Sequence, residues 1–307
     1  MKPSQPPTTA SAQKGALAAT TCYFLWGLVP LYWKQLAAVN PLELVAHRHI
    51  WSLALLIGLI SLQGNFRDLA TALRSGATLK NQLVSALLLT GNWLIYVWGV
   101  NTGHVIETSL GYFLVPLVNV AAGRFVLHEH LRRAQWLAIG LAAGGVTWMI
   151  VQAGRPPWIA LAVAFTWGGY SLMRKRSTLG AITGLTVETI LLAPCALIFL
   201  AWQHHTGASA LGRVDLSSHL LILSSGVITA IPLLLFGYGA QRIRLSTLGL
   251  LQYLAPSVQL VLGIWVYHES FSHSRALAFS FIWAALVLYT ADNLIAQHRE
   301  RHPLPLH

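Results

Sequence analysis

Charged residues are scarce in this chain of 307 residues. Only 9% of them are Asp, Glu, Lys or Arg, whereas a typical soluble domain contains about 25%. This scarcity argues strongly against a lone water-soluble enzyme, because a soluble surface of this size needs many more charges. Hydrophobic residues make up 55% of the chain and the mean hydropathy is +0.59, which argues against disorder. The composition predicts a membrane protein.

Cysteines and acidic residues are also few. Cys22 and Cys195 are the two cysteines, and both lie in long apolar runs, where a free thiol behaves as a small hydrophobic group; no disulfide framework is expected. Nine acidic residues stand against 20 Lys and Arg, a formal net charge of +11. In a soluble protein this excess would suggest nucleic acid, but in an apolar chain it predicts basic cytoplasmic loops.

Long hydrophobic runs are abundant. A spanning helix needs about 20 mostly apolar residues, and ten segments qualify: 15–33, 42–62, 81–101, 107–127, 135–152, 157–173, 181–202, 218–240, 247–267 and 276–297. The runs are continuous rather than alternating, so they predict helices and not barrel strands. Residues 1–14 are expected to form a disordered cytoplasmic tail without a cleavable signal, and 298–307 a second cytoplasmic tail.

The basic residues of the connections test this count. With the amino terminus inside, the inner segments carry 14 Lys and Arg and the outer loops carry Lys34, Arg155, Arg213 and Arg275. Such asymmetry supports ten crossings with both termini in the cytoplasm. It also accounts for the net charge without a nucleic-acid partner.

The two halves of the chain resemble each other. Residues 110–129 and 250–269 are identical at eight of twenty positions, and they share a P-x6-G-x4-HE spacing that starts at Pro116 and at Pro256. A second match, at an offset of 141, pairs Phe24, Trp26, Gly27, Leu31 and Lys34 with Phe165, Trp167, Gly168, Leu172 and Lys175. The pattern predicts an internal duplication.

Five helices per half is an odd number, so the second half must enter the membrane from the opposite side. The expected fold is an all-α integral membrane protein with ten transmembrane helices, arranged as two inverted-topology repeats over 15–152 and 157–297. Many secondary transporters have this layout, with the substrate site near the midplane between the halves. No ATP-binding motif is present, and no cofactor is expected.

Several stretches resemble the RarD-type proteins of the EamA family, within the drug/metabolite transporter superfamily. They are YFLWGLVPLYWK (23–34), AHRHIWS (46–52), GNWLIYVWGVN (91–101), ETSLGYFLVPLVN (107–119) and RLSTLGLLQYLAP (244–256). The resemblance covers nearly the whole chain. It implies a ten-helix permease of the bacterial inner membrane, in a family whose members export amino acids, other small metabolites or drugs, including drugs of the chloramphenicol type.

Only six charged residues fall inside the ten segments: Glu43, Arg48, Glu107, Arg124, Glu188 and Asp292. A charge at the bilayer centre costs about 2.5–3.5 kcal/mol on insertion scales, so such residues usually face a partner or a wet cavity. Arg124 and Asp292 lie near cytoplasmic ends and are interpreted as structural. Glu43 and Glu107 lie near outer ends, where either an interfacial charge or an outer vestibule is consistent with the sequence.

Arg48 and Glu188 are the most informative of the six. Each lies about 10 Å into its helix, from opposite sides, and Glu188 is the repeat equivalent of His47. Glu43, His47 and Trp51 share one helix face. We hypothesise that His47, Arg48, Trp51 and Glu188 border a central cavity, where Arg48 holds an anionic group and Glu188 binds an amine or carries a coupling proton. The alternative is an internal salt bridge.

Neutral polar and aromatic residues form a second candidate set. The expected cavity residues are Asn92, Trp93, Tyr112, Asn119, Gln252 and Tyr253. The expected hinge residues are Gly111, Pro116, Gly249 and Pro256, because proline bends a helix and glycine permits close approach or hinging. The alternative for the first group is interhelical contact together with interfacial aromatic belts.

Thirteen histidines raise the question of a metal site. His47 and His49 are two positions apart on a helix, so their side chains point apart and do not readily chelate one ion. The repeated His-Glu pairs at 128–129 and 268–269 are expected to begin tight turns after their helices. No metal site is predicted.

The leading functional prediction is a secondary transporter that exports a small amphipathic metabolite or drug by alternating access, as a monomer or homodimer. An intramembrane enzyme is the second hypothesis, although no catalytic dyad or Asp-rich metal motif supports it. A non-transporting scaffold is the third, and the repeat and the buried charges argue against it. No selectivity-filter sequence suggests a channel. Proton coupling and facilitated diffusion both remain open.

Overall fold

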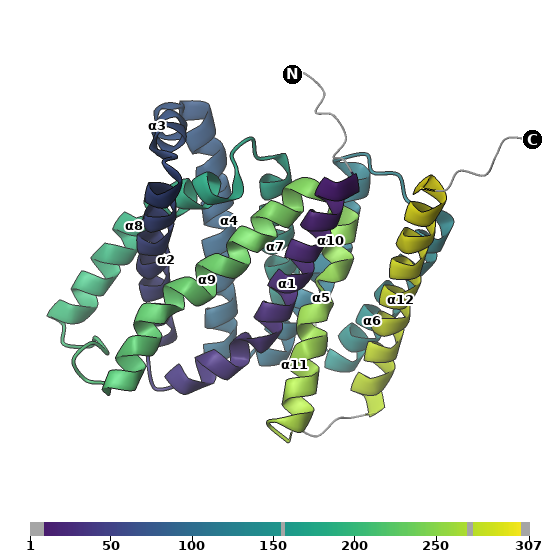
Figure 1. Ribbon diagram of the computed structural model, residues 1–307. Coiled ribbons are helices and arrows are strands. Elements are labelled where there is room, and N and C mark those ends of the chain that lie inside the picture. The colour runs from purple at the N-terminus through teal and green to yellow at the C-terminus, as the bar shows by residue number, and fades with distance from the viewer. Residues whose placement is uncertain (1–8, 155–156, 269–272, 302–307) are drawn as a thin grey trace, which may run out of the picture.

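The computed structural model describes residues 9–154, 157–268 and 273–301. These residues form a bundle of α-helices without strands (Figure 1). The helices are α1 (Thr9–Trp33), α2 (Pro41–Gln63), α3 (Phe66–Arg74), α4 (Gly76–Asn101), α5 (Val105–Phe125), α6 (Arg133–Ala153), α7 (Trp158–Arg176), α8 (Ala181–His205), α9 (Leu216–Arg242), α10 (Leu245–Leu251), α11 (Leu254–Trp265) and α12 (His273–Arg301). A short 3-10 turn, η1 (Lys34–Leu36), follows α1.

Local sequence explains where α2 begins and ends. The Asn40 side chain accepts a hydrogen bond from the Leu42 amide at 2.9 Å, and Pro41 occupies the first helical position, where its missing N–H costs nothing. At the other end Gly64 adopts a left-handed conformation with φ 68°, which glycine reaches without steric cost. The segment between these signals is one continuous membrane-length helix.

The expected chain ends differ from the structure. Helix α1 begins at Thr9, so residues 9–14, predicted to belong to a disordered tail, are helical. At the carboxyl end α12 continues to Arg301, beyond the predicted start of the second tail at 298. The remaining tail residues, 1–8 and 302–307, lie outside the described residues.

Two internal segments also differ. The connection over 63–80 contains helix α3, which buries Leu69 and Ala72 and exposes its polar side. The single helix expected over 247–267 is two helices, α10 and α11. The amides of Gln252 and Tyr253 bond to carbonyls three residues back, so the chain makes a tight turn there before it continues.

Nine helical segments of the described residues are long and apolar enough to cross a membrane, counting α1 with η1 and α10 with α11 as one segment each. Helix α7 would be the tenth span. Its last turn carries Arg174, Lys175 and Arg176, and these three basic residues lower its mean hydropathy. The count of ten crossings remains a prediction.

Packing relates the first half, α1–α6, to the second half, α7–α12. Helix α1 packs against α9 and α11, as its counterpart α7 packs against α4 and α5. A Cβ added at Gly27 of α1 would lie 2.5 Å from Val258, and one added at Gly168 of α7 would lie 2.5 Å from Val118. These four residues are related by the offsets of the sequence repeat, so equivalent helices make the same close contact in each half.

The two halves run in opposite directions. Near the start of α1, Gly15 packs against Arg242 and Ile243. In the last turn of α7, the Lys175 ammonium donates to the Ile243 carbonyl. Helix α1 therefore begins at the end of the bundle where α7, its repeat equivalent, finishes. This antiparallel relation is what an inverted duplication requires.

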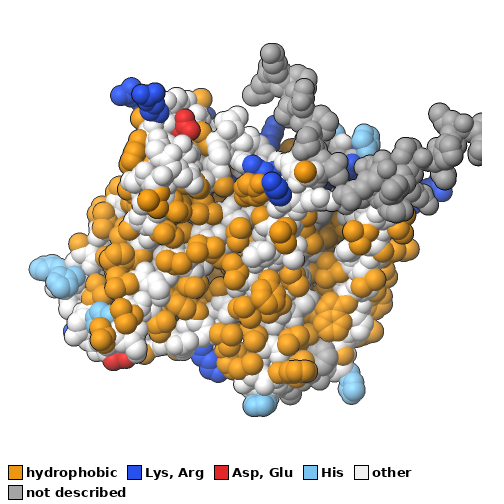
Figure 2. Space-filling model, viewed as in Figure 1, with side chains coloured by type: hydrophobic (Ala, Val, Ile, Leu, Met, Phe, Trp, Pro, Cys, Tyr) orange, Lys and Arg blue, Asp and Glu red, His pale blue; other side chains and the backbone are white. Residues whose placement is uncertain are grey.

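The surface of the bundle is apolar around its middle. Side chains such as Ile198 and Val287 are each 70% exposed, although both are strongly hydrophobic. Figure 2 shows hydrophobic side chains across the centre of the visible face, with most Lys and Arg along the edge where α1 begins. A surface of this kind suits hydrocarbon in the middle and water at a basic edge.

Candidate functional site

A cavity of about 620 Å³ lies between the two halves. Its aromatic, charged and polar lining residues are Tyr23, Trp26, Trp33, Lys34, Arg48, Trp93, Tyr96, Ser109, Tyr112, Phe113, Trp167, Thr229, Gln252 and Gln259. Lys34, Ala37 and Pro41 line it and are also exposed, so the cavity reaches the surface beside η1. We call this side of the bundle the open end.

The opposite side, which we call the clasped end, is closed by contacts between the halves. Glu129 of the first half accepts from the Leu245 amide at 2.6 Å, and from the Ser246 amide at 3.1 Å and hydroxyl at 2.6 Å. Arg244 donates to the His130 carbonyl at 3.1 Å. The Glu129 carboxylate thus binds the first residues of α10, where free backbone amides favour an anion.

The tight turns expected at the two His-Glu pairs begin at His128 and His268. These two residues alone among the described non-glycine residues have positive φ, at 55° and 52°. The preceding residues, Val126 and Val266, also match, with φ −98° at both and ψ −37° and −39°. The same chain reversal therefore follows α5 and α11, which are repeat equivalents.

Of the ten cavity residues predicted from the sequence, four line this cavity: Arg48, Trp93, Tyr112 and Gln252. One predicted hinge residue, Pro256, lines it too. The other six predicted cavity residues are His47, Trp51, Asn92, Asn119, Glu188 and Tyr253, and the structure places each of them outside this lining.

Arg48 is a charged residue of α2 that lines the cavity. Its guanidinium carbon lies 3.6 Å from the centre of the Trp93 ring and 5.7 Å from that of Trp33. Its Nε atom is buried without a hydrogen-bond partner. Among the described residues no carboxylate lies within ion-pair distance of Arg48. Two tryptophan rings thus contact this cation, one of them at cation–π distance.

Aromatic side chains form the inner wall. The Trp26 and Trp167 rings, which are repeat equivalents, meet edge to face with centroids 5.1 Å apart. Tyr23 lies 5.7 Å from Trp26, and Phe236 lies 5.4 Å from Trp167. Such edge-on and tilted packing fixes the rings and presents flat apolar surfaces to a ligand.

Asn92 supports the cavity wall from behind. Its Nδ2 donates to the Val163 carbonyl at 2.9 Å and to the Thr166 hydroxyl at 3.0 Å, and its Oδ1 accepts from the Tyr112 hydroxyl at 3.1 Å. The side chain is fully buried. Its location differs from the prediction because the bonds to Val163 and Thr166 direct the amide into the α4–α7 contact. Asn92 positions Tyr112, and Tyr112 faces the cavity.

Glu188 lies in a separate polar cluster rather than beside Arg48. Its Oε1 accepts from Ser85 at 2.7 Å and from Arg174 Nη1 at 3.2 Å, and the Tyr170 hydroxyl donates to Oε2 at 3.4 Å. Arg174 and Glu188 are 1% and 2% exposed. The internal salt bridge held open as an alternative therefore exists, but Arg174 is its cation and it joins α7 to α8.

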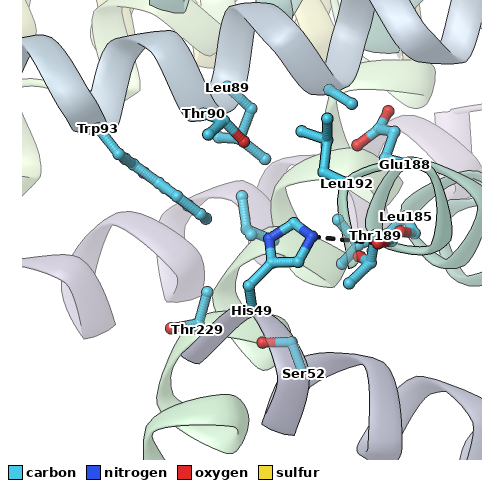
Figure 3. Close-up of a pocket in the computed structure, with 12 residues that line it drawn as sticks. His49, Ser52, Leu89, Thr90, Trp93, Leu185, Glu188, Thr189, Leu192 and Thr229 are labelled. Atoms are coloured by element: carbon cyan, nitrogen blue, oxygen red, sulfur yellow. Dashed lines mark hydrogen bonds between the residues drawn. The ribbon is translucent and has the colours of Figure 1, made fainter. Parts of the chain in front are cut away.

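A small pocket adjoins this cluster. Figure 3 shows His49 of α2 and Trp93 of α4 on either side of it, with Glu188 and Thr189 of α8 at one edge. The His49 Nε2 atom lies 3.1 Å from the Thr189 carbonyl. Trp93 and Thr229 line both this pocket and the central cavity. Glu188 thus lines a pocket that shares wall residues with the central cavity.

His47 and Trp51 turn away from the cavity along α2. His47 lies 3.7 Å from Glu43, which accepts from the Ser209 hydroxyl at 2.8 Å and from the Ala210 amide. The shared face predicted for Glu43, His47 and Trp51 packs on protein because the connection before α9 supplies donors to Glu43. Trp51 packs where α2 crosses α9, against Gly226.

Asn119, Tyr253 and the glycines lie where the halves meet. The Tyr253 hydroxyl donates to the Phe113 carbonyl at 3.1 Å, between repeat-equivalent positions. A Cβ added at Gly249 would lie 2.8 Å from the Asn119 Cβ and 2.9 Å from the Pro116 carbonyl oxygen. Asn119 and Tyr253, predicted to face the cavity, instead pack where α5 meets α10 and the turn that follows it.

Gly111 makes a similar close approach in the first half. A Cβ there would lie 2.6 Å from the Val163 Cβ and 2.9 Å from the Ala160 carbonyl oxygen. Gly111 and Gly249 thus allow helices to touch across the interface between the halves. Pro116 lies inside α5, where it leaves one helical hydrogen bond unmade. Whether these positions act as hinges stays a prediction.

Sequence reasoning missed several contributors. Trp33 and Tyr96 line the cavity, and their positions one turn from Pro30 and from Trp93 were the available signal. Arg174 was counted as a loop residue because Lys175 and Arg176 follow it. Among the described residues no group of three or more His, Cys, Asp or Glu could hold a metal ion.

The fold and the cavity define a class: a multi-pass membrane protein of two matching helical halves around one central site, as in membrane transporters. The chain belongs to the EamA-like transporter family, whose model matches residues 13–151 and again residues 156–291. It is therefore a membrane transporter of the drug/metabolite type.

Curated relatives extend over nearly the whole chain. An uncharacterized transporter of Vibrio cholerae is 42% identical, covering 96% of this chain and 98% of its own. Protein RarD of Streptomyces exfoliatus is also 42% identical, covering 94% and 91%. The chloramphenicol-sensitive protein RarD of Pseudomonas aeruginosa is 26% identical, covering 91% and 94%. One crystal structure, 22% identical, superposes with a TM-score of 0.70 over 90% of this chain and 97% of that chain, which supports the fold.

Proposed function

We propose that this protein is a secondary permease that moves a small amphipathic metabolite across the bacterial inner membrane by alternating access. The observation that carries the proposal is a cavity between two inverted halves that reaches the surface at one end and is closed by Glu129 at the other. Two such halves can exchange conformations, which would close the open end and release the clasped end. Both termini lie in the cytoplasm, and export is the direction of transport.

The charge distribution supports this orientation. Basic residues of α3, such as Arg67 and Arg74, and those of the last turn of α7 lie on the clasped side, which is then cytoplasmic. The open end, with Lys34 at its rim, faces the outside. The candidate substrates from family resemblance are amino acids and chloramphenicol-type drugs, and the aromatic walls suit a compound with a ring.

The Glu129 clasp gives a direct test of alternating access. The two carboxylate oxygens of Glu129 accept three hydrogen bonds from α10. Glu129→Gln removes the negative charge and replaces one of these oxygens by an amide NH2 group, which cannot accept. A charge-assisted bond contributes about 1.5–3 kcal/mol. We expect the equilibrium constant between the cytoplasm-facing and the outward-facing state to rise roughly tenfold, since 1.4 kcal/mol is one decade. The reporter is a cysteine in place of Val29, which lines the cavity, in a variant that lacks Cys22 and Cys195. This cysteine should then react more slowly with an impermeant maleimide added outside.

Asp68→Asn is the matched control, because it also changes a carboxylate to an amide but lies exposed on α3. It should leave the labelling rate of the Val29 cysteine unchanged. Equal rates in the Glu129→Gln and wild-type proteins would contradict a gate at the clasped end.

Glu188 is the coupling candidate. In inverted vesicles with a proton gradient, we expect Glu188→Gln to abolish accumulation of whichever radiolabelled probe is transported among phenylalanine, chloramphenicol and phenylacetate, while exchange down a gradient persists. A neutral side chain in place of the carboxylate cannot take up and release the coupling proton. The double variant Arg174→Met with Glu188→Gln removes the unpaired charge and should show the same loss. Full accumulation in the double variant would show that the Arg174–Glu188 pair has a structural role only.

A further inference from the structure

We propose that the cavity selects an organic monoanion that carries a flat aromatic ring, such as an aryl carboxylate, over zwitterionic or neutral compounds. This inference deepens the proposed function and rests on it. It names a narrower ligand class than amino acids or amphenicols. The argument starts from the charges that line the cavity.

The cavity wall is positive. Among the residues that the structure describes, Lys34 and Arg48 are the charged side chains that line it, and no acidic side chain does. Three acids of the spanning helices are occupied elsewhere: Glu43 by Ser209 and Ala210, Glu188 by Arg174, and Asp292 by Arg132 at 2.5 Å. Glu107 is buried outside the lining. A cation inside the membrane without a partner is costly, so a bound anion would stabilise this site.

The geometry of Arg48 fits a carboxylate. The Trp93 ring covers one face of the guanidinium at 3.6 Å, which leaves the edge of the planar group for hydrogen bonding. The Nε atom is buried, so the terminal Nη1 and Nη2 atoms are the donors left for a ligand. A carboxylate accepts two parallel N–H bonds from this pair of atoms, and this pairing is specific to arginine.

The surrounding rings suit the rest of the ligand. Trp26, Trp33, Trp93, Tyr96 and Tyr112 all line the same cavity as Arg48. Flat aromatic surfaces pack well against a ring of the ligand. An amino acid would also bring an ammonium group, for which this lining offers no carboxylate. A neutral drug would leave Arg48 dehydrated and unpaired. Both should therefore bind more weakly than an aryl monoanion.

Phenylacetate and its neutral isostere phenylacetamide provide matched probes. We expect purified protein in an uncharged detergent at pH 7.5 to bind phenylacetate in isothermal titration calorimetry. Phenylacetamide and phenylalanine should each bind at least about tenfold more weakly, the effect of losing one charge-assisted pair or of burying an unpaired ammonium. Arg48→Gln should abolish the preference for phenylacetate. Arg48→Lys, which keeps the charge but not the planar edge, should retain part of it.

Arg213→Gln is the control, because it removes an exposed cation of the connection between α8 and α9 that does not line the cavity. It should leave phenylacetate affinity unchanged. Gel filtration and thermal unfolding confirm that each variant is folded, and Arg48→Lys provides the comparison if Arg48→Gln does not fold. Equal affinity for phenylacetate and phenylacetamide, no binding of phenylacetate, or a preference unchanged in both Arg48 variants would overturn the inference.

Proteoliposomes separate this inference from the proposed function. Net movement of a monoanion carries charge, so phenylacetate should produce a protein-dependent current that phenylacetamide does not. Arg48-dependent binding without any flux would support the proposed ligand class and contradict the proposed permease function. Flux of phenylalanine or chloramphenicol with no binding of phenylacetate would support the permease function and contradict the proposed ligand class.

Discussion

Replacing Gly226 with alanine is expected to prevent stable packing of α2 against α9. An added Cβ would lie 2.3 Å from the Trp51 carbonyl carbon and 2.5 Å from the Ser52 nitrogen. These are backbone atoms in the middle of α2, so no side-chain rotation relieves the overlap, and the two helices must separate. The Ser52 hydroxyl bond to the Gly226 carbonyl, 3.1 Å long, would be lost as well.

The energetic cost should exceed the ordinary range for overpacking, about 1–3 kcal/mol, because backbone must move. Thermal unfolding in detergent, followed by intrinsic fluorescence, measures it. Gly58→Ala is the matched control. Gly58 lies on α2, the helix that Gly226 of α9 contacts, and a Cβ at Gly58 meets nothing within 4 Å. That change should leave stability unaltered or raise it by about 0.5–1 kcal/mol, since alanine favours helix over glycine. Similar melting temperatures for the two variants would show that the contact is loose.

The duplication and the spanning helices could be predicted because they depend on local composition. Helix length, apolar content and the P-x6-G-x4-HE spacing all lie in contiguous sequence. The turn at Gln252 and Tyr253 could not be predicted in the same way. Gly249 and Pro256 flank it at a distance, and the Tyr253 side chain at the break bonds to the Phe113 carbonyl in the other half, a contact that local sequence does not reveal.

The candidate site was only partly predictable for a related reason. Neighbouring helical residues point about 100° apart, since 3.6 residues make one turn, so Arg48 faces the cavity while His47 does not. The pattern of α2 alone does not say which face meets the cavity. The face that packs on protein is the one that carries Glu43, which accepts hydrogen bonds from Ser209 and Ala210, more than 160 residues away in sequence. Contacts of this kind exist only in the folded chain.

Arg174→Met should destabilise the protein strongly. The substitution leaves the Glu188 carboxylate buried, 2% exposed, without the cation 3.2 Å away. Removing one member of a buried ion pair costs about 3–5 kcal/mol, mainly because the remaining charge stays dehydrated. Gly184 and Gly237 pack directly against the guanidinium, so methionine, which is long and flexible, is the substitution that best keeps the volume filled.

Two comparisons isolate the electrostatic part of this loss. The double variant Arg174→Met with Glu188→Gln has no buried charge at this position, and it should recover most of the melting temperature lost in the single variant. Arg132→Met removes the cation of a more exposed pair, in which the side chains of Arg132 and Asp292 are 38% and 18% exposed, and it should cost at most about 1 kcal/mol.

If the double variant were no more stable than Arg174→Met, the loss would come from packing around Gly184 and Gly237 and not from an unpaired carboxylate. A recovered melting temperature together with lost proton-driven accumulation would assign both roles to Glu188: the arginine makes its burial tolerable, and the carboxylate carries the proton. A buried pair between two helices of the second half, beside a pocket that shares Trp93 with the cavity, would then couple the proton gradient to the movement of the halves.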